Sequence, residues 1–222
     1  MSLVRALVEI QLLVDHQHIR LNDTTEQRVP LVLVQILAKI LLSQNIDGSW
    51  GLEQCPETTA YAVLALLAFD SLPYIQVLGK EIQQALERGE AALSSQKELW
   101  TKPNALWLST TAYASSLTSE AYSIATTQML IERRSRGTQS AKPMSSLAAE
   151  VLKFSKVFFS MDHLSKQPPF MIKATMLEGL FYRPILQAKR TDVFPQTDTT
   201  SKDKYLHYIP LMVLLALSLI HI

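Results

Sequence analysis

Apolar residues recur every three or four positions along most of the chain, which is the spacing of one face of an α-helix. Short segments rich in Gly, Pro, Asn or Ser interrupt this pattern, and no stretch alternates apolar and polar residues as a half-buried strand does. The pattern therefore predicts a series of helices. In chain order they cover residues 3–19, 32–42, 58–69, 73 to about 94, about 111 to 134, 147–159, 169–188 and a last segment from 204 onward.

Two of the joining segments differ from the others. Residues 45–51 carry the Asn, Asp, Gly and Ser of a tight turn, and residues 136–143 hold Gly, Ser, Thr and Pro with almost no apolar side chain. The second segment separates helical hairpins over residues 1–135 from further helices over residues 144–222. Because consecutive helices bury their apolar stripes on one another, the predicted fold class is all-α, built from antiparallel helix pairs. A bundle, a solenoid and an αα-barrel all satisfy this demand.

Composition and charge narrow the function classes. Apolar residues make up 48% of the 222 residues and charged ones 18%, which favours one sizeable core of buried helices. The formal net charge is +1 and the basic residues are dispersed, so we exclude nucleic-acid binding. The single cysteine, Cys55, excludes an internal disulfide and a multi-thiolate zinc site, which leaves a cytoplasmic location as the default.

The two ends of the chain predict neither a signal peptide nor a transmembrane span. Arg5, Glu9 and Asp15 interrupt the first apolar segment. Residues 208–222 are almost wholly apolar, but they are fewer than the roughly 20 residues that cross a bilayer. Because this last segment has no polar cap, we interpret it as a core helix without its continuation, and the chain as a piece of a longer protein.

Residues 44–51 read Gln-Asn-Ile-Asp-Gly-Ser-Trp-Gly and follow an apolar helix. This segment resembles the glutamine-tryptophan motif of terpene cyclase αα-barrels, whose role is structural. We expect Asp47 and Gly48 to form a tight turn in which Gly48 takes a positive φ. We also expect Trp50 to stack against the amide of Gln44 and so to tie two helix ends together.

Later segments occur in the same order as blocks of a more specific group. Glu-Thr-Thr-Ala-Tyr-Ala at 57–62, Leu-Trp at 106–107 and Leu-Thr-Ser-Glu-Ala-Tyr at 117–122 resemble fungal bifunctional diterpene synthases of the copalyl diphosphate/kaurene synthase type. The resemblance covers about residues 31–210 and implies the downstream part of the class II half, an incomplete αα-barrel. Segments that resemble the end of that half lie at 158–160, 177–179, 194–195 and 203–210.

The resemblance implies a chemistry as well as a fold. In this family a class II site protonates geranylgeranyl diphosphate with the central Asp of an Asp-x-Asp-Asp motif, an acid kept neutral by burial and neighbouring carboxyl groups. The class I half removes diphosphate with Mg²⁺ bound to clustered acidic residues. None of the eight aspartates here is adjacent to another, and no such ligand set is present. We therefore expect a fragment of a terpenoid-biosynthesis enzyme that carries no catalytic residue and is inactive alone.

Two departures from the family pattern also count against activity. Where the family has an acidic-basic pair after the block's tryptophan and one aliphatic residue, this chain has Ser109 and Thr110. Residues 211–213, Leu-Met-Val, replace the Thr-Trp expected after an Ile-Pro pair.

Six residues are candidates for the lining of a cavity. Aromatic rings stabilise a carbocation as they do any cation, and carboxylates contact a magnesium-bound diphosphate or polarise a water. The alternative interpretation makes the rings ordinary core residues, and makes the acids a helix-start residue and a solvated one. Similarly, a basic group at the end of a predicted helix and in the following loop either binds diphosphate or compensates a helix dipole, and it consists of Arg133, Arg134, Arg136 and Lys142. The six candidates are Tyr61, Trp107, Tyr113, Tyr122, Glu57 and Glu120.

Three hypotheses for the role of the chain follow. The first is a fragment of a class II isoprenoid-diphosphate cyclase domain. The second is a non-catalytic helical partner that packs on a complete cyclase through an uncovered apolar surface. The third is the remnant of an interrupted coding sequence. Protein prenyltransferase subunits also bind isoprenoid diphosphates, but their zinc site of Asp, Cys and His does not fit a chain with one cysteine.

Overall fold

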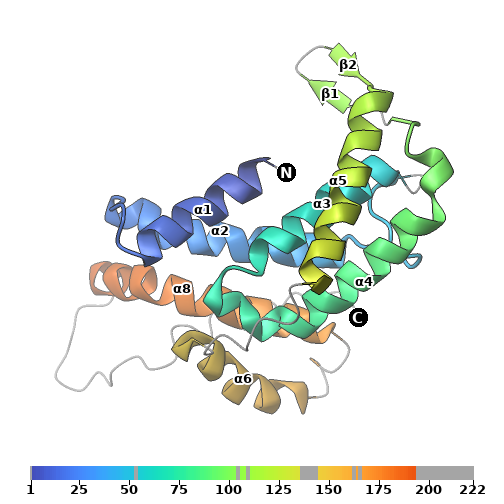
Figure 1. Ribbon diagram of the computed structural model, residues 1–222. Helices are drawn as coiled ribbons and strands as arrows, with labels where there is room; N and C mark the ends of the chain where they lie inside the picture. The colour runs from blue at the N-terminus through green and yellow to red at the C-terminus, as the bar shows by residue number, and fades with distance from the viewer. Residues whose placement is uncertain are drawn as a thin grey trace. The chain divides into compact units, whose positions relative to one another are not determined.

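The computed structural model describes residues 2–52, 55–103, 106–108, 111–135, 145–161, 164 and 167–193. Helices make up most of this part of the chain (Figure 1). The all-α prediction is confirmed. The main helices are α1 (Ser2–Asp15), α2 (Asp23–Leu42), α3 (Pro56–Phe69), α4 (Gly79–Ser95), α5 (Ser116–Ser135), α6 (Ser146–Phe159) and α8 (Pro169–Val193), with short 3-10 helices η2 (Pro73–Leu78) and η3 (Lys97–Leu99).

The chain forms two compact units whose segments alternate along the sequence. One unit, here called unit 1, comprises Met1–Ala6, Lys39–Ser71 and Gly79–Pro143. Unit 2 takes segments from both sides of residues 136–143, and they are Leu7–Ala38, Leu72–Leu78 and Met144–Ile222. The predicted division into residues 1–135 and 144–222 therefore describes chain order, and as a statement about functional domains it stays a prediction.

Helix α2 begins well before the predicted residue 32. The side chain of Asn22 accepts a hydrogen bond from the backbone N–H of Thr25 at 2.9 Å, which caps the helix start at Asp23. Pro30 lies inside the helix, where its missing N–H leaves one backbone carbonyl unpaired. Val29 and Leu31 beside it are buried, so tertiary packing holds a helix that local sequence disfavours.

A two-stranded hairpin precedes α5, where the sequence had predicted a loop and then a helix from about residue 111. Strands β1 (Leu106–Leu108) and β2 (Thr111–Tyr113) pair antiparallel, and α5 begins only at Ser116 (Figure 1). Strands of three residues are too short for an alternating pattern to be visible, although β-branched and aromatic residues favour them. The helix predicted from residue 204 lies outside the described residues.

Helix α3 is the centre of unit 1, and its side chains pack against both α4 and α5. It is apolar on almost every face, with Ala60, Val63, Leu66 and Phe69 completely buried. In unit 2, α6 and α8 pack on each other and on η2. The rings of Tyr74 and Phe181 there meet edge to face at 5.0 Å.

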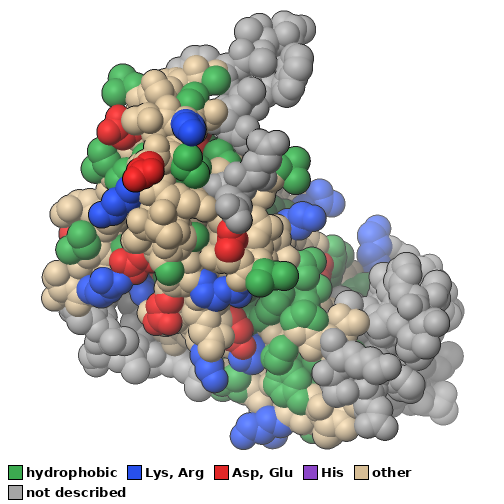
Figure 2. Space-filling view, turned by 90° about the vertical axis from the view of Figure 1, so that its right-hand side faces the viewer, with side chains coloured by type: hydrophobic (Ala, Val, Ile, Leu, Met, Phe, Trp, Pro, Cys, Tyr) green, Lys and Arg blue, Asp and Glu red, His purple; other side chains and the backbone are tan. Residues whose placement is uncertain are grey.

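The described surface carries charges of both signs. Basic, acidic and hydrophobic side chains lie interspersed on the face shown in Figure 2. Within the described ranges, no single helix is long and apolar enough to cross a membrane. The segments Pro56–Phe69 and Pro73–Ser95 reach that length and hydropathy only together, across a sharp bend.

Candidate functional site

The turn after α2 is held by its own polar side chains. Asp47 Oδ1 accepts hydrogen bonds from the Ser49 backbone N–H at 3.0 Å and from Ser49 Oγ at 2.7 Å. These bonds, the side-chain one first, hold the pKa of Asp47 below its ordinary value of 3.8. Gly48 has φ +92°, and a Cβ there would lie 2.4 Å from the carbonyl oxygen of Arg88 in α4. The turn therefore requires glycine for both conformation and space.

Gln44 and Trp50 connect this turn to two helices by hydrogen bonds. Gln44 Nε2 donates to the carbonyl oxygens of Gly48 and Ala85, both at 3.0 Å, which joins the turn to α4. The indole N–H of Trp50 donates to the Ile40 carbonyl at the end of α2, at 2.8 Å. The Ile40 carbonyl lies in the last turn of α2 and the Gly48 carbonyl in the turn, where backbone acceptors lack intrahelical partners. The motif ties elements of unit 1 together through hydrogen bonds to the backbone. The stacking of Trp50 on the Gln44 amide stays a prediction.

Two contacts of the Trp50 residue were missed by sequence reasoning. Its backbone N–H donates to Thr59 Oγ1 in α3 at 3.0 Å. Its ring, on a residue only 3% exposed, lies where a Cβ on Gly89 of α4 would approach Cζ3 to 2.8 Å. Gly89 gave no signal in the sequence, because a glycine within a helix is explained only by what packs against it.

The structure brings three of the six cavity candidates together. The hydroxyl of Tyr61 donates to Oε1 of Glu57 at 2.6 Å, one turn earlier on α3. The Tyr61 ring meets the Tyr122 ring of α5 edge to face, with centroids 4.7 Å apart. Burial and then the hydrogen bond to the Glu57 carboxylate raise the pKa of Tyr61 well above its usual value. The group combines a buried carboxylate, a phenol fixed as its donor and two ring surfaces.

Helix α5 meets α3 through small hydroxyl residues. Ser119, Ser123 and Thr126 are completely buried, and they follow the spacing of one helix face. Thr126 Oγ1 donates to the Tyr122 carbonyl at 2.7 Å, and Ser123 Oγ donates to that of Ser119 at 2.9 Å. The sequence pattern did not predict this face, because helix faces are recognised by the spacing of apolar residues and the buried residues here are polar.

Of the other three candidates, the structure describes the side chain of Glu120 alone. Trp107 in β1 pairs with Ala112 in β2, and Tyr113 pairs with Leu106. The side chains of Trp107 and Tyr113 lie outside what the structure describes. Glu120 is half-buried on α5. The roles of all six residues stay predictions.

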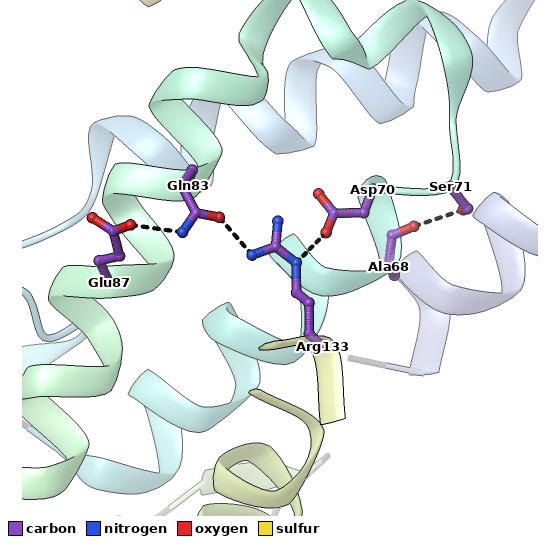
Figure 3. A network of polar contacts seen from close by, with 6 residues as sticks. All are labelled: Ala68, Asp70, Ser71, Gln83, Glu87 and Arg133. Atoms are coloured by element: carbon purple, nitrogen blue, oxygen red, sulfur yellow. Dashed lines mark hydrogen bonds and ion pairs between the residues drawn. The ribbon is translucent and has the colours of Figure 1, made fainter. Parts of the chain in front are cut away.

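Arg133 and Arg134, at the end of α5, pair with carboxylates. Arg133 donates from Nε to Asp70 Oδ2 at 2.6 Å and from a terminal nitrogen to Gln83 Oε1 at 2.5 Å (Figure 3). Arg134 forms an ion pair with Glu90 of α4. These contacts join α5 to α3 and α4, and both guanidinium groups already have anionic partners. The structure therefore gives no support to a diphosphate site at these arginines.

The residues present do not fit a magnesium site. Within the described ranges, no three side chains of His, Cys, Asp and Glu come together in a way that would hold a metal ion. Glu57 is a single carboxylate with one oxygen already bonded to Tyr61. Mg²⁺ requires several oxygen ligands in octahedral geometry. We therefore assign no metal-dependent step to these residues.

Sequence comparison identifies relatives along nearly the whole chain. A pimaradiene synthase of Emericella nidulans is 32% identical over 183 residues, which is 82% of this chain and 18% of that protein. A phyllocladan-16-alpha-ol synthase of Phomopsis amygdali is 28% identical, and an ent-kaur-16-ene synthase of Fusarium fujikuroi is 27% identical. Each of these two alignments covers 95% of this chain and 22% of the relative.

No protein-family model and no solved structure matches the chain. The chain spans about a fifth of the length of the curated relatives that it matches. All of these relatives are fungal diterpene synthases, as the blocks of residues 57–62 and 117–122 had indicated. The chain is homologous to one segment of the fungal diterpene synthases.

Proposed function

We propose that the helices of this chain form part of the wall of the substrate cavity in the class II cyclase part of a diterpene synthase. We also propose that the chain does not cyclise a substrate alone. The observation that carries the proposal is the similarity to diterpene synthases along 82–95% of the chain. The substrate class that we propose for the complete cavity is an isoprenoid diphosphate, geranylgeranyl diphosphate in the first instance.

The cluster of Glu57, Tyr61 and Tyr122 supports this proposal. Ring faces carry negative charge density and stabilise a cation that passes close to them. The Tyr61 hydrogen bond to Glu57 fixes the phenol and places a buried carboxyl group directly behind it. The protein supplies shape and electrostatics in such a wall, whereas protonation needs a neutral buried acid that this chain's dispersed aspartates do not form.

The absence of activity in the isolated chain is tested directly. Purified chain is incubated with geranylgeranyl diphosphate and Mg²⁺, the extract is treated with phosphatase, and the products are analysed by gas chromatography and mass spectrometry. We expect only geranylgeraniol, as in a boiled control. A cyclised product well above that control contradicts the proposal.

The wall function is tested in a chimera. The 183 matched residues of the Emericella nidulans pimaradiene synthase are replaced by the matching residues of this chain. We expect the folded chimera to form a cyclised diterpene. The matched control carries Tyr122→Ala, which deletes one ring of the edge-to-face pair. A chimera that is folded by circular dichroism and monodisperse, but forms no cyclised product, overturns the proposed function.

A second candidate function, a helical partner of a synthase chain, is favoured by the outer face of α5. This helix has buried hydroxyl residues on the inside, whereas Leu117, Ile124 and Ile131 are 76%, 52% and 47% exposed on the outside. The three residues are seven positions apart, so they form one apolar stripe. Apolar stripes of this kind are normally covered. The match covers only 18% and 22% of these relatives, so they contain further chain that can cover the stripe.

The partner function is tested with a defined partner. The chain is co-expressed with the Emericella nidulans pimaradiene synthase, and complex formation is measured by light scattering after affinity purification. Under this second candidate we expect a stable complex that Ile124→Glu abolishes. Ala125→Glu, which adds the same charge at the adjacent exposed position, is the matched control. A chain that stays monomeric in the presence of the synthase excludes this candidate.

A further inference from the structure

Two buried residues of unit 1 each have a side-chain oxygen without a hydrogen-bond partner among the described residues. These oxygens are Oε2 of Glu57, a residue 3% exposed, and Oγ of Ser119, which is 0% exposed. Leaving a buried hydroxyl or carboxylate oxygen unpaired costs free energy, and native proteins pair nearly all such groups. Both atoms therefore require a partner.

Contacts between α3 and α5 place these two atoms at the same end of the helix pair. Tyr61 meets Tyr122, and Asp70 at the end of α3 pairs with Arg133, so residue numbers rise together along the two helices. Glu57 precedes Tyr61 by one turn and Ser119 precedes Tyr122 by almost one turn. Both unpaired oxygens thus lie just before the same aromatic contact.

We propose that Glu57 and Ser119 bind one ordered water molecule, which is a hydroxyl-binding site beside the Tyr61 and Tyr122 rings. The carboxylate oxygen accepts one hydrogen from the water, and the serine hydroxyl exchanges a second hydrogen bond with it. Buried waters typically make about three hydrogen bonds to groups that are otherwise unsatisfied. The two unpaired groups are a carboxylate and a hydroxyl, and a neutral hydrogen-bond donor such as water pairs with both. A diphosphate is a poor ligand for this site, because its negative charge is repelled by the carboxylate of Glu57.

This inference does not depend on the proposed cyclase function, because it concerns the buried polarity of α3 and α5 alone. It also gives Glu57 two defined bonds, one from Tyr61 and one from water. The carboxylate oriented in this way holds the phenol and the water at fixed positions on the same wall.

Melting temperatures of the full chain test the proposal. If water bridges the two residues, Ser119→Ala leaves Glu57 less well paired, and the melting temperature falls by about 2–4 °C. In a Glu57→Leu background the same substitution shifts it by less than about 1 °C, because the bridge no longer exists. If instead the hydroxyl is simply unpaired, Ser119→Ala leaves the melting temperature unchanged or raises it, which overturns the proposal.

Two further measurements keep the result interpretable. Ser123→Ala removes a neighbouring buried hydroxyl that bonds within α5, so its effect is expected to be equal in both backgrounds. If a variant does not fold, a high-resolution crystal structure of the full chain shows directly whether a water bridges Glu57 and Ser119. We expect a water oxygen at roughly 2.6–3.2 Å from both Glu57 Oε2 and Ser119 Oγ. Density that shows these two atoms without a water between them overturns the proposal.

Discussion

The Cα of Gly89 faces the indole ring of Trp50 so closely that an added Cβ would lie 2.8 Å from ring atom Cζ3. The same Cβ would lie 2.8 Å from a methyl group of Val63 in α3. Helix α4 thus approaches the Gln-Trp turn and α3 at a point where no side chain fits. This close approach lets Gln44 reach the Ala85 carbonyl one turn earlier on α4.

Gly89→Ala is expected to destabilise the protein by about 1–3 kcal/mol, because the extra methyl group overpacks a closed contact. The measurement is chemical denaturation followed by circular dichroism. Gly79→Ala is the matched control on the same helix, since a Cβ there meets no atom within 4 Å. The control is expected to be neutral or slightly stabilising. Equal effects of the two substitutions would show that the Trp50 contact is not tight.

Tyr61→Phe is expected to lower the free energy of unfolding by about 1–3 kcal/mol, because Glu57 then keeps a buried carboxylate without its donor. Tyr122→Phe preserves the edge-to-face ring contact and is expected to change it by less than about 0.5 kcal/mol. Urea denaturation of both variants compares them. If Tyr61→Phe and Tyr122→Phe lower the free energy of unfolding equally little, the hydrogen bond between Tyr61 and Glu57 does not stabilise the fold.

Asp47→Asn is expected to reduce the loss of stability in acid. The folded-state pKa of Asp47 lies below 3.8, so its contribution is present above about that pH and is lost as pH falls through the lower folded-state value. Urea midpoints at pH 7, 5 and 3 measure this. The native protein is expected to lose more than the variant between pH 5 and 3. Parallel pH curves for the two proteins would contradict this role of the carboxylate.

Asp70→Asn is expected to cost less than about 1 kcal/mol, since both partners of its ion pair with Arg133 are about one third exposed. The cost is expected to vanish in about 1 M salt, where the Debye length is only about 3 Å. Gln83→Ala removes the neutral partner of the same arginine, and its cost is expected to persist in salt (Figure 3). Melting temperatures at low and high salt distinguish the two.

Periodicity predicted the helices well where an apolar face packs on the core, as in α3 and α6. It failed where local chemistry opposed the final structure. Pro30 concealed the first part of α2, and the hairpin before α5 is too short to show alternation. Burial of the residues beside Pro30 decided the first case, and burial is a property of the tertiary structure.

The candidate site was predictable only residue by residue. The residue types Glu57, Tyr61 and Tyr122 were singled out from the sequence, but their contact depends on how α3 and α5 pack. Ser119 gave no signal, because a serine within a helix is usually solvated, and only its complete burial distinguishes it. Arg133 was ambiguous until its partners Asp70 and Gln83, more than 45 positions away, were placed.

The alternation of segments between the two compact units has a consequence for dissecting the molecule. Since Leu7–Ala38 and Leu72–Leu78 belong with the C-terminal part, no single cut in the chain releases either unit by itself. A chain that ends at Pro143 keeps all of unit 1, but it also keeps Leu7–Ala38 and Leu72–Leu78 without the rest of unit 2. Domain-swapped or minimal versions of this protein must therefore be sought by circular permutation or by rejoining three separate stretches, and shortening from one end will not produce them.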